Sequence, residues 1–199
     1  MDILTFSLAL AAYFALHSIM AANSVKKFLT ASIIKERYYR LFFNAVASLL
    51  LVAILYFYFL VEKEVLLKND WLALPGVLLV LAGLYWLLKA MESYDTSEFL
   101  GTYQSKHGKA PEHISLNTSG LNGRVRHPLY FGTLLVIWGG FLLLPNNASL
   151  SVAVVSTVYV VIGSLLEEQK LEQQFGEAYR LYRRQVPMLI PFPWKSGEK

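Results

Sequence analysis

The sequence predicts an all-α integral membrane protein, and three observations support this fold class. Hydrophobic residues make up 55% of the 199 residues and charged residues only 16%, a balance unlike that of a soluble domain. The apolar residues fall into five blocks of about 17–21 residues, the length that crosses a hydrocarbon core of about 30 Å. None of these blocks contains Asp or Glu. We expect one membrane domain over residues 1–199, with transmembrane helices at about 3–22, 41–61, 71–91, 128–144 and 149–166.

The distribution of basic residues predicts how these helices cross the membrane. Most of the 18 lysines and arginines lie in segments 23–40 and 92–126 and in the tail after residue 167, whereas segment 145–148 has none. Cytoplasmic loops carry the excess of Lys and Arg, so we expect the N-terminus outside and the C-terminus in the cytoplasm. The first block lacks the basic start of a signal peptide, so we expect it to be a retained span.

Composition also argues against several classes of function. The chain has no cysteine, which excludes disulfides, thiolate metal sites and a cysteine nucleophile. The net charge of +4 follows from topology, because the basic residues flank spans, so we expect no nucleic-acid partner. His107 and His113 have no partner ligands at metal spacing, and we expect no metal site.

Polar segments outside the spans show weaker patterns. Segment 23–40 interleaves apolar residues with lysines, which is typical of a helix in the headgroup layer. A loop as long as segment 92–126 is usually functional or disordered, and its aromatic and aliphatic residues favour an ordered lid. After Glu168 we expect an amphipathic interfacial helix with a weak point at Gly176, ending before Val186, and then a proline-rich strip at 190–194 that folds back over the site.

The last two spans form a hairpin that brings distant residues to one membrane face. A short turn at 145–147 joins them, and short loops connect antiparallel neighbours. The start of the fourth span at His127 and the end of the fifth at Glu167 and Glu168 must therefore emerge on the same cytoplasmic side.

The charges at these two ends suggest a zwitterionic ligand. Pro128 suits the first turn of a helix, and the helix start together with Arg126 and His127 favours a carboxylate or phosphate. The two glutamates suit an ammonium group or sugar hydroxyls. The same residues are also compatible with a purely structural role, in which Arg126 is a membrane anchor and the glutamates begin a solvated helix.

Three motifs resemble the signature of the isoprenylcysteine carboxyl methyltransferase family. They are RHPLY at 126–130, EEQKL at 167–171 with FGEAY at 175–179, and VP at 186–187 with IPF at 190–192. Their order and spacing match over roughly residues 115–193. Looser matches around His17, segment 37–44 and segment 94–101 are similar to the bacterial branch that contains methanethiol S-methyltransferase and NnrU-type proteins.

This resemblance implies an integral-membrane enzyme of the bacterial cell membrane that takes S-adenosylmethionine at the cytoplasmic face. Its partners would be membrane lipid and a small or lipophilic methyl acceptor, with a thiol favoured. No G-x-G occurs, so a Rossmann-type cofactor site is not encoded. Carried over by motif, the cofactor-binding residues are Gly120, Leu121, Val125, Arg126, His127, Tyr130, Glu167 and Glu168.

Catalytic roles and rival functions stay open at this point. A thiol acceptor must lose a proton, and Arg126, His127 and His17 are candidates to assist it. The first alternative is carboxyl methylation of a prenyl-cysteine-like acceptor. Another is a reductase that binds a nicotinamide cofactor, and a third is a non-enzymatic membrane transport or assembly protein.

Overall fold

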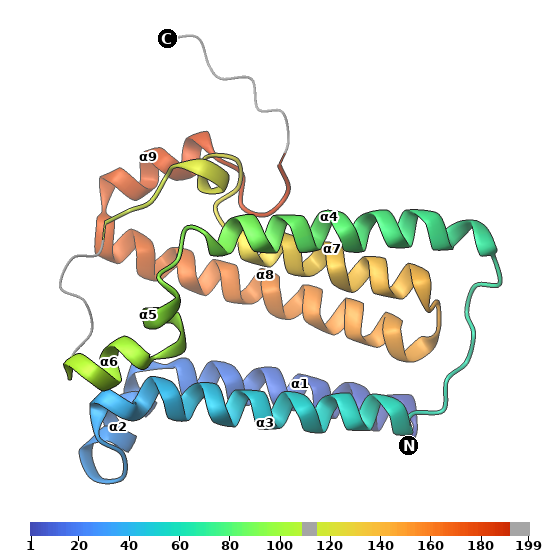
Figure 1. Cartoon of the computed structure of the whole chain (residues 1–199), viewed down its shortest axis with the longest axis horizontal. Coiled ribbons are helices and arrows are strands. Elements are labelled where there is room, and N and C mark those ends of the chain that lie inside the picture. Colours follow the sequence, from blue (N-terminus) through green and yellow to red (C-terminus); the bar gives the residue numbers. More distant parts are fainter. Residues whose placement is uncertain (109–114, 192–199) are drawn as a thin grey trace. The chain divides into compact units, whose positions relative to one another are not determined.

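The structure, a computed structural model, describes residues 1–108 and 115–191, and these residues form helices and connecting segments without a β-strand. The all-α prediction is confirmed. The described residues divide into two compact units, one with residues 1–66, 94–108 and 146–155 and the other with 67–93, 115–145 and 156–191 (Figure 1). The expectation of a single membrane domain stays a prediction.

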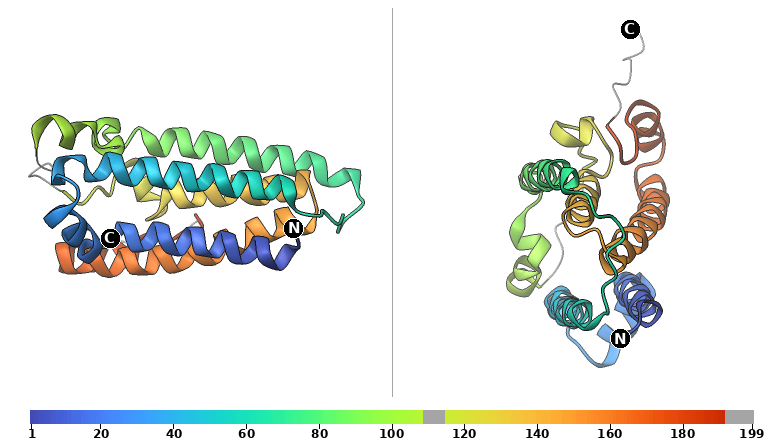
Figure 2. Two further views of the ribbon diagram at one scale, coloured as in Figure 1. Left: turned by 90° about the horizontal axis from the view of Figure 1, so that it is seen from below. Right: turned by 90° about the vertical axis from the view of Figure 1, so that its right-hand side faces the viewer.

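The first unit is built on two long antiparallel helices. Helix α1 (Ile3–Ala21) and helix α3 (Tyr39–Leu60) lie side by side (Figures 1 and 2). Their core contains Phe6, Leu10 and Ile54. The short α2 (Asn23–Ser32) and a 3-10 turn, η1 (Glu36–Tyr38), connect them, so the amphipathic helix expected within segment 23–40 occupies its first part.

Two short helices of the first unit, α5 (Thr96–Leu100) and α6 (Thr102–His107), are held by capping contacts. The Asp95 side chain accepts from the N–H groups of Ser97 and Glu98 and so begins α5. From α3, Arg40 Nε donates to the Phe99 carbonyl, and Asn44 donates to the carbonyls of Phe99 and Leu100. Two of the loosely matching sequence segments therefore pack against each other.

In the second unit, helices α4 (Ala73–Met91) and α7 (Pro128–Leu143) pack closely through glycines. A Cβ added to Gly83 of α4 would lie 2.8 Å from the Gly132 carbonyl oxygen, and one added to Gly139 of α7 would lie 2.9 Å from the Gly76 carbonyl oxygen. The backbones can approach this closely only because these positions carry no side chain. Gly140 of α7 has no atom within 4 Å of its added Cβ and does not take part.

Helix α8 (Asn147–Phe175) continues well past residue 166, where we expected the fifth span to end. No proline or glycine follows residue 163 until Gly176, so nothing in the backbone ends the helix sooner. Gly176 has a φ of 56°, a value that favours glycine, and the chain turns there into α9 (Glu177–Gln185). The predicted break at Gly176 and the helix end before Val186 are confirmed. The separate amphipathic helix, however, begins only after Gly176.

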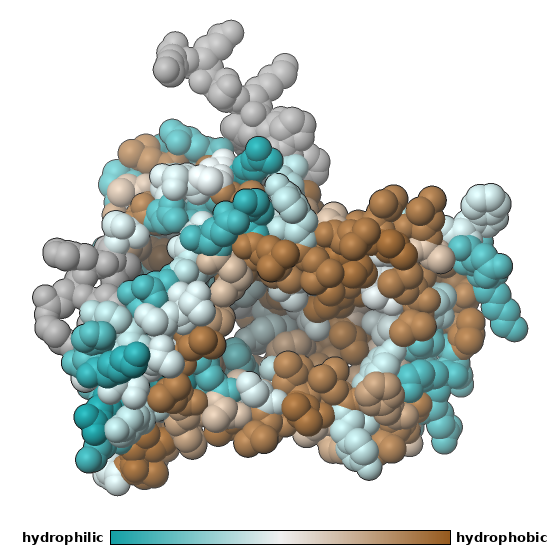
Figure 3. All heavy atoms as spheres, viewed as in Figure 1, coloured by the Kyte–Doolittle hydropathy of each residue, from teal (hydrophilic) through white to brown (hydrophobic). Residues whose placement is uncertain are grey.

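The helix lengths fit a membrane protein. Four helical stretches are long and apolar enough to cross a membrane, at Ile3–Ala21, Glu36–Leu60, Asp70–Met91 and Asn147–Phe175, and α7 is a shorter apolar helix. Hydrophobic side chains cover the visible face of α4 (Figure 3), as expected for a surface that meets lipid. These helices correspond to the five predicted spans.

Candidate functional site

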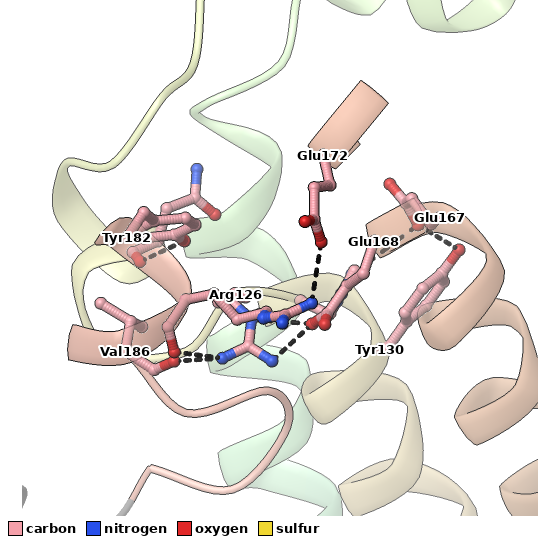
Figure 4. Close-up of polar contacts among 10 residues, drawn as sticks. Arg126, Tyr130, Glu167, Glu168, Glu172, Tyr182 and Val186 are labelled. Atoms are coloured by element: carbon pink, nitrogen blue, oxygen red, sulfur yellow. Dashed lines mark hydrogen bonds and ion pairs between the residues drawn. The ribbon is translucent and has the colours of Figure 1, made fainter. Parts of the chain in front are cut away.

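Arg126 is the centre of a polar cluster in the second unit (Figure 4). It lies between η3 (Gly120–Gly123) and the start of α7. Its Nε and Nη2 atoms lie 2.7 Å and 2.6 Å from Glu168 Oε1. Its Nη1 donates to the carbonyls of Arg183 and Val186, at the end of α9. The Arg126 and Glu168 side chains are only 9% and 7% exposed, so this buried ion pair joins α7, α8 and α9.

The chain after α9 also pairs with the segment that holds Arg126. The N–H of Arg126 donates to the Pro187 carbonyl at 2.9 Å, and the N–H of His127 donates to the Met188 carbonyl at 3.1 Å. Pro187 favours an extended residue before it, and Val186 is extended. The chain at 187–188 therefore lies against this segment. The fold-back of the strip at 190–194 stays a prediction, because Phe192, Pro193 and Trp194 lie outside the described residues.

His127 and Tyr130 form the part of the cluster nearest to Glu167. His127 is buried, with Nε2 3.3 Å from Glu168 Oε1 and Nδ1 3.7 Å from Glu167 Oε2. Its ring stacks on Tyr130 with centroids 5.5 Å apart, and the Tyr130 hydroxyl donates to Glu167 Oε2 at 3.1 Å. The Glu167 side chain is 46% exposed, so it is the carboxylate of this cluster that solvent or a ligand reaches.

The start of α7 adds a partial positive charge. Pro128 occupies the first helical turn, and the His127 side chain at the N-cap position makes no capping hydrogen bond. The N-terminus of a helix has a partial positive charge and attracts anions. This end of α7 begins beside the His127 ring and is therefore part of the cluster.

Helix α9 is fixed by tyrosines on one side and arginines on the other. Tyr182 donates to the Asn122 carbonyl at 2.6 Å and so ties α9 to η3. Glu172 of α8 lies 2.7 Å from Arg180 and 3.0 Å from Arg183. Tyr179 is fully buried, and burial raises the pKa of its hydroxyl above the ordinary value. This tyrosine stays protonated at neutral pH.

The structure brings most of the predicted site residues into one place. A continuous chain of contacts joins Arg126, Glu168, His127, Glu167 and Tyr130, although about forty residues separate the two groups in sequence. Gly120 and Leu121 form part of η3, and Val125 is fully buried directly before Arg126.

Other predicted residues lie elsewhere. His17 belongs to the first unit, where its ring lies 4.9 Å from that of Phe43. No group of three or more His, Asp or Glu within residues 1–108 and 115–191 is arranged to hold a metal, and His113 is outside the described residues.

Sequence reasoning missed Ser164 of α8. This side chain is fully buried four residues before Glu168. A serine within an apolar run carries no motif, and Ser164 is distinguished by full burial without a hydrogen-bond partner among the described residues.

Comparison with known families gives a match to phospholipid methyltransferase over residues 71–178, more than half of the chain. The chain belongs to the phospholipid methyltransferase family. The matched region includes α4, α7 and α8 and most of the polar cluster around Arg126.

Several curated relatives are named methanethiol S-methyltransferase. The one from Pseudomonas deceptionensis is 31% identical over 180 residues, which is 88% of this chain and 67% of the relative. Those from Crocosphaera subtropica and a Pseudomonas species are 48% identical over 73 residues and 33% identical over 123. These two matches cover 37% and 58% of this chain but only 28% and 46% of the relatives' own length. No solved structure matches the chain significantly.

Proposed function

We propose that this protein is an integral-membrane methyltransferase that uses S-adenosylmethionine and methylates a small thiol at the cytoplasmic membrane face. The observation that carries the proposal is the cluster of Arg126, His127, Tyr130, Glu167 and Glu168. These residues lie at the ends of two apolar helices and come from two sequence segments, 126–130 and 167–168. Membership of a methyltransferase family supports the reaction class. The relatives' name favours a thiol over a prenyl-cysteine-like carboxylate.

The polar groups of the cluster fit S-adenosylmethionine. Glu167 is half-exposed, and only its Oε2 accepts the Tyr130 hydroxyl. Both Arg126 and His127 contact Glu168 through its Oε1 atom, and neither contacts Oε2. The remaining carboxylate oxygens suit an ammonium group or ribose hydroxyls, and the start of α7 suits a carboxylate. We therefore propose that these residues, lined by Gly120, Leu121 and Val125, hold the methyl donor.

The chain's own contribution to the reaction is binding, orientation and exclusion of water. S-adenosylmethionine supplies a methyl group activated by a sulfonium charge. Methyl transfer is an in-line displacement that depends mainly on how the two partners are positioned. His127 and Tyr130, stacked together against the glutamates, give the site a rigid wall, and the folded tail at 187–188 helps to exclude water.

The membrane and orientation are part of the same proposal. The basic segments at 23–40, 92–126 and 167–199 favour a cytoplasmic C-terminus and an outer N-terminus. The named relatives come from bacteria, which favours the bacterial cell membrane.

Binding of S-adenosylhomocysteine to the purified protein in detergent tests the cofactor assignment. We expect Glu167→Gln to weaken binding about 10-fold or more, because a hydrogen bond to a charged group is lost. His127→Ala should also weaken it. Glu177→Gln, which changes an exposed glutamate of α9, is the matched control and should bind normally. If the parent protein does not bind the compound, the cofactor assignment is wrong.

The acceptor is tested with isotopically labelled S-adenosylmethionine and a panel of small thiols, lipids and prenyl-cysteine analogues. We expect mass spectrometry to find the label on the small thiols. Label on a prenyl-cysteine carboxylate alone would contradict the thiol assignment, and label on none of the compounds would contradict the enzyme assignment.

A further inference from the structure

The Ser164 side chain is fully buried, and its hydroxyl makes no hydrogen bond with any residue that the structure describes. A serine within a helix usually bonds the carbonyl of the preceding turn or points to solvent. Ser164 does neither. Buried polar groups in native proteins nearly always have a partner, so this hydroxyl needs one from outside the described chain.

The position of Ser164 connects it with the candidate site. The buried residues of α8 in the second unit repeat at four-residue intervals, at Ser156, Val160, Ser164 and Glu168. Residues four apart lie on the same face of a helix, one turn from each other. Ser164 therefore lies one turn before Glu168, within the predicted apolar span 149–166, on the membrane side of the polar cluster.

Arg126 and His127, two other donors of the cluster, are already engaged. Each of the three guanidinium nitrogens of Arg126 contacts Glu168 or the end of α9. Both ring nitrogens of His127 face the two glutamates. Neither residue is a free donor for an anionic acceptor. The titratable groups near this turn are Arg126, His127, Tyr130, Glu167, Glu168 and Tyr179.

We propose that the Ser164 hydroxyl donates a hydrogen bond to the sulfur of the thiolate acceptor and so positions it for methyl transfer. This inference rests on the proposed function. An apolar thiol reaches the site from the membrane side, where Ser164 lies, whereas the charged groups that suit the methyl donor lie one turn further along α8.

The acceptor releases its thiol proton to water. A lone pair of the thiolate sulfur forms the new bond to the methyl carbon, while the bond from that carbon to the sulfonium sulfur breaks and its electron pair stays on the departing sulfur. A hydrogen bond to the charged form of a group favours ionisation, so Ser164 lowers the pKa of the bound thiol.

Ser164→Ala tests this role with four measurements on the full-length protein. The KM for a small thiol should rise. The rise of kcat with pH, which reports ionisation in the enzyme–substrate complex, should move about one to two units higher. Affinity for S-adenosylhomocysteine should not change. The melting temperature of the ligand-free protein should stay the same or rise, because an unpaired buried hydroxyl has been removed.

Ser156→Ala is the matched control, since it makes the same change at a buried position two turns away on α8. It should alter none of the thiol parameters. Ser164→Cys keeps a weak donor and should fall between the parent and Ser164→Ala in KM.

Two results would overturn the assignment of Ser164. One is a Ser164→Ala variant with the parent's KM and the parent's kcat profile. The other is a ligand-free variant that melts earlier or does not fold, which would make the hydroxyl a structural group. A parent protein that methylates no thiol would contradict the proposed function itself, and it would do so before any variant is compared.

Discussion

Replacing Arg126 with alanine should destabilise the protein by about 3–5 kcal/mol, the cost of removing one partner of a buried ion pair. Both side chains are less than a tenth exposed, so Glu168 would keep its charge with little water to solvate it. The substitution also removes the two hydrogen bonds that Nη1 donates to the Arg183 and Val186 carbonyls at the end of α9. The loss should be visible as a lower unfolding free energy in detergent and as faster amide exchange in α9.

A double-mutant cycle separates the ion pair from general damage. Arg126→Ala and Glu168→Ala should each be strongly destabilising, and the double variant should cost up to about 3 kcal/mol less than their sum. Arg124→Ala changes an exposed arginine two residues away and should have an effect within about 0.5 kcal/mol. If Arg126→Ala costs less than 1 kcal/mol, or if the two losses simply add, the ion pair does not hold α9 in the way described.

Three further predictions concern packing, burial and capping. Gly83→Ala should lower the melting temperature by several degrees, because its methyl group would lie 2.8 Å from a backbone oxygen, whereas Gly140→Ala, which meets no atom within 4 Å, should not lower it. Burial raises the pKa of Tyr179 above its unfolded value of about 10. The stability that this tyrosine contributes is therefore present below about pH 10 and is lost as the pH rises further. In a denaturation series above about pH 10, Tyr179→Phe should lose less stability with rising pH than the parent protein. The hydrogen bond from the Ser97 side chain lowers the pKa of Asp95, so this cap is present above about pH 4 and is lost as the pH falls through the lowered value. Protection of the Ser97 amide from hydrogen exchange, relative to its intrinsic rate at the same pH, should be lost in Asp95→Ala at neutral pH and in the parent only in acid.

Topology was the most predictable aspect of the site. Two apolar helices joined by a short turn must place His127 and Glu168 at the same end, and the structure confirms this with a distance of 3.3 Å between them. The prediction needed only span lengths and loop lengths, which are properties of local sequence. It did not depend on how any side chain is oriented.

The end of the fifth helix was less predictable for a physical reason. Polarity at residue 167 marks where apolar residues cease, and it predicts that the last span gives way there to a separate helix. A helix, however, ends where its backbone conformation or capping changes, and Gly176 is the first residue after 163 that favours such a change. The additional turns carry Glu172, whose contacts with Arg180 and Arg183 hold α9 in place.

The partner of Arg126 could not be predicted from the motif. We expected Arg126 and the glutamates to form opposite walls of a zwitterion site, but Arg126 and Glu168 bind each other. Charge signs in a sequence show which residues can attract one another. Which of them actually meet depends on side-chain reach and on the α9 carbonyls that orient the guanidinium.

The two adjacent glutamates must therefore have different roles. Consecutive residues point about 100° apart on a helix, so Glu168 lies on the buried stripe of α8 whereas Glu167 lies beside it and is half-exposed. A ligand that displaced Arg126 from Glu168 would have to compensate for a broken buried pair, a cost of about 3–5 kcal/mol. A ligand that binds Glu167 avoids this cost. With Arg126 neutralised by Glu168, the charge left over in the cluster is the negative charge of Glu167, and a negative site that is partly shielded from water favours a cationic ligand. This residual charge, rather than a pair of opposite walls, is the physical basis on which we expect a positively charged methyl donor to bind here.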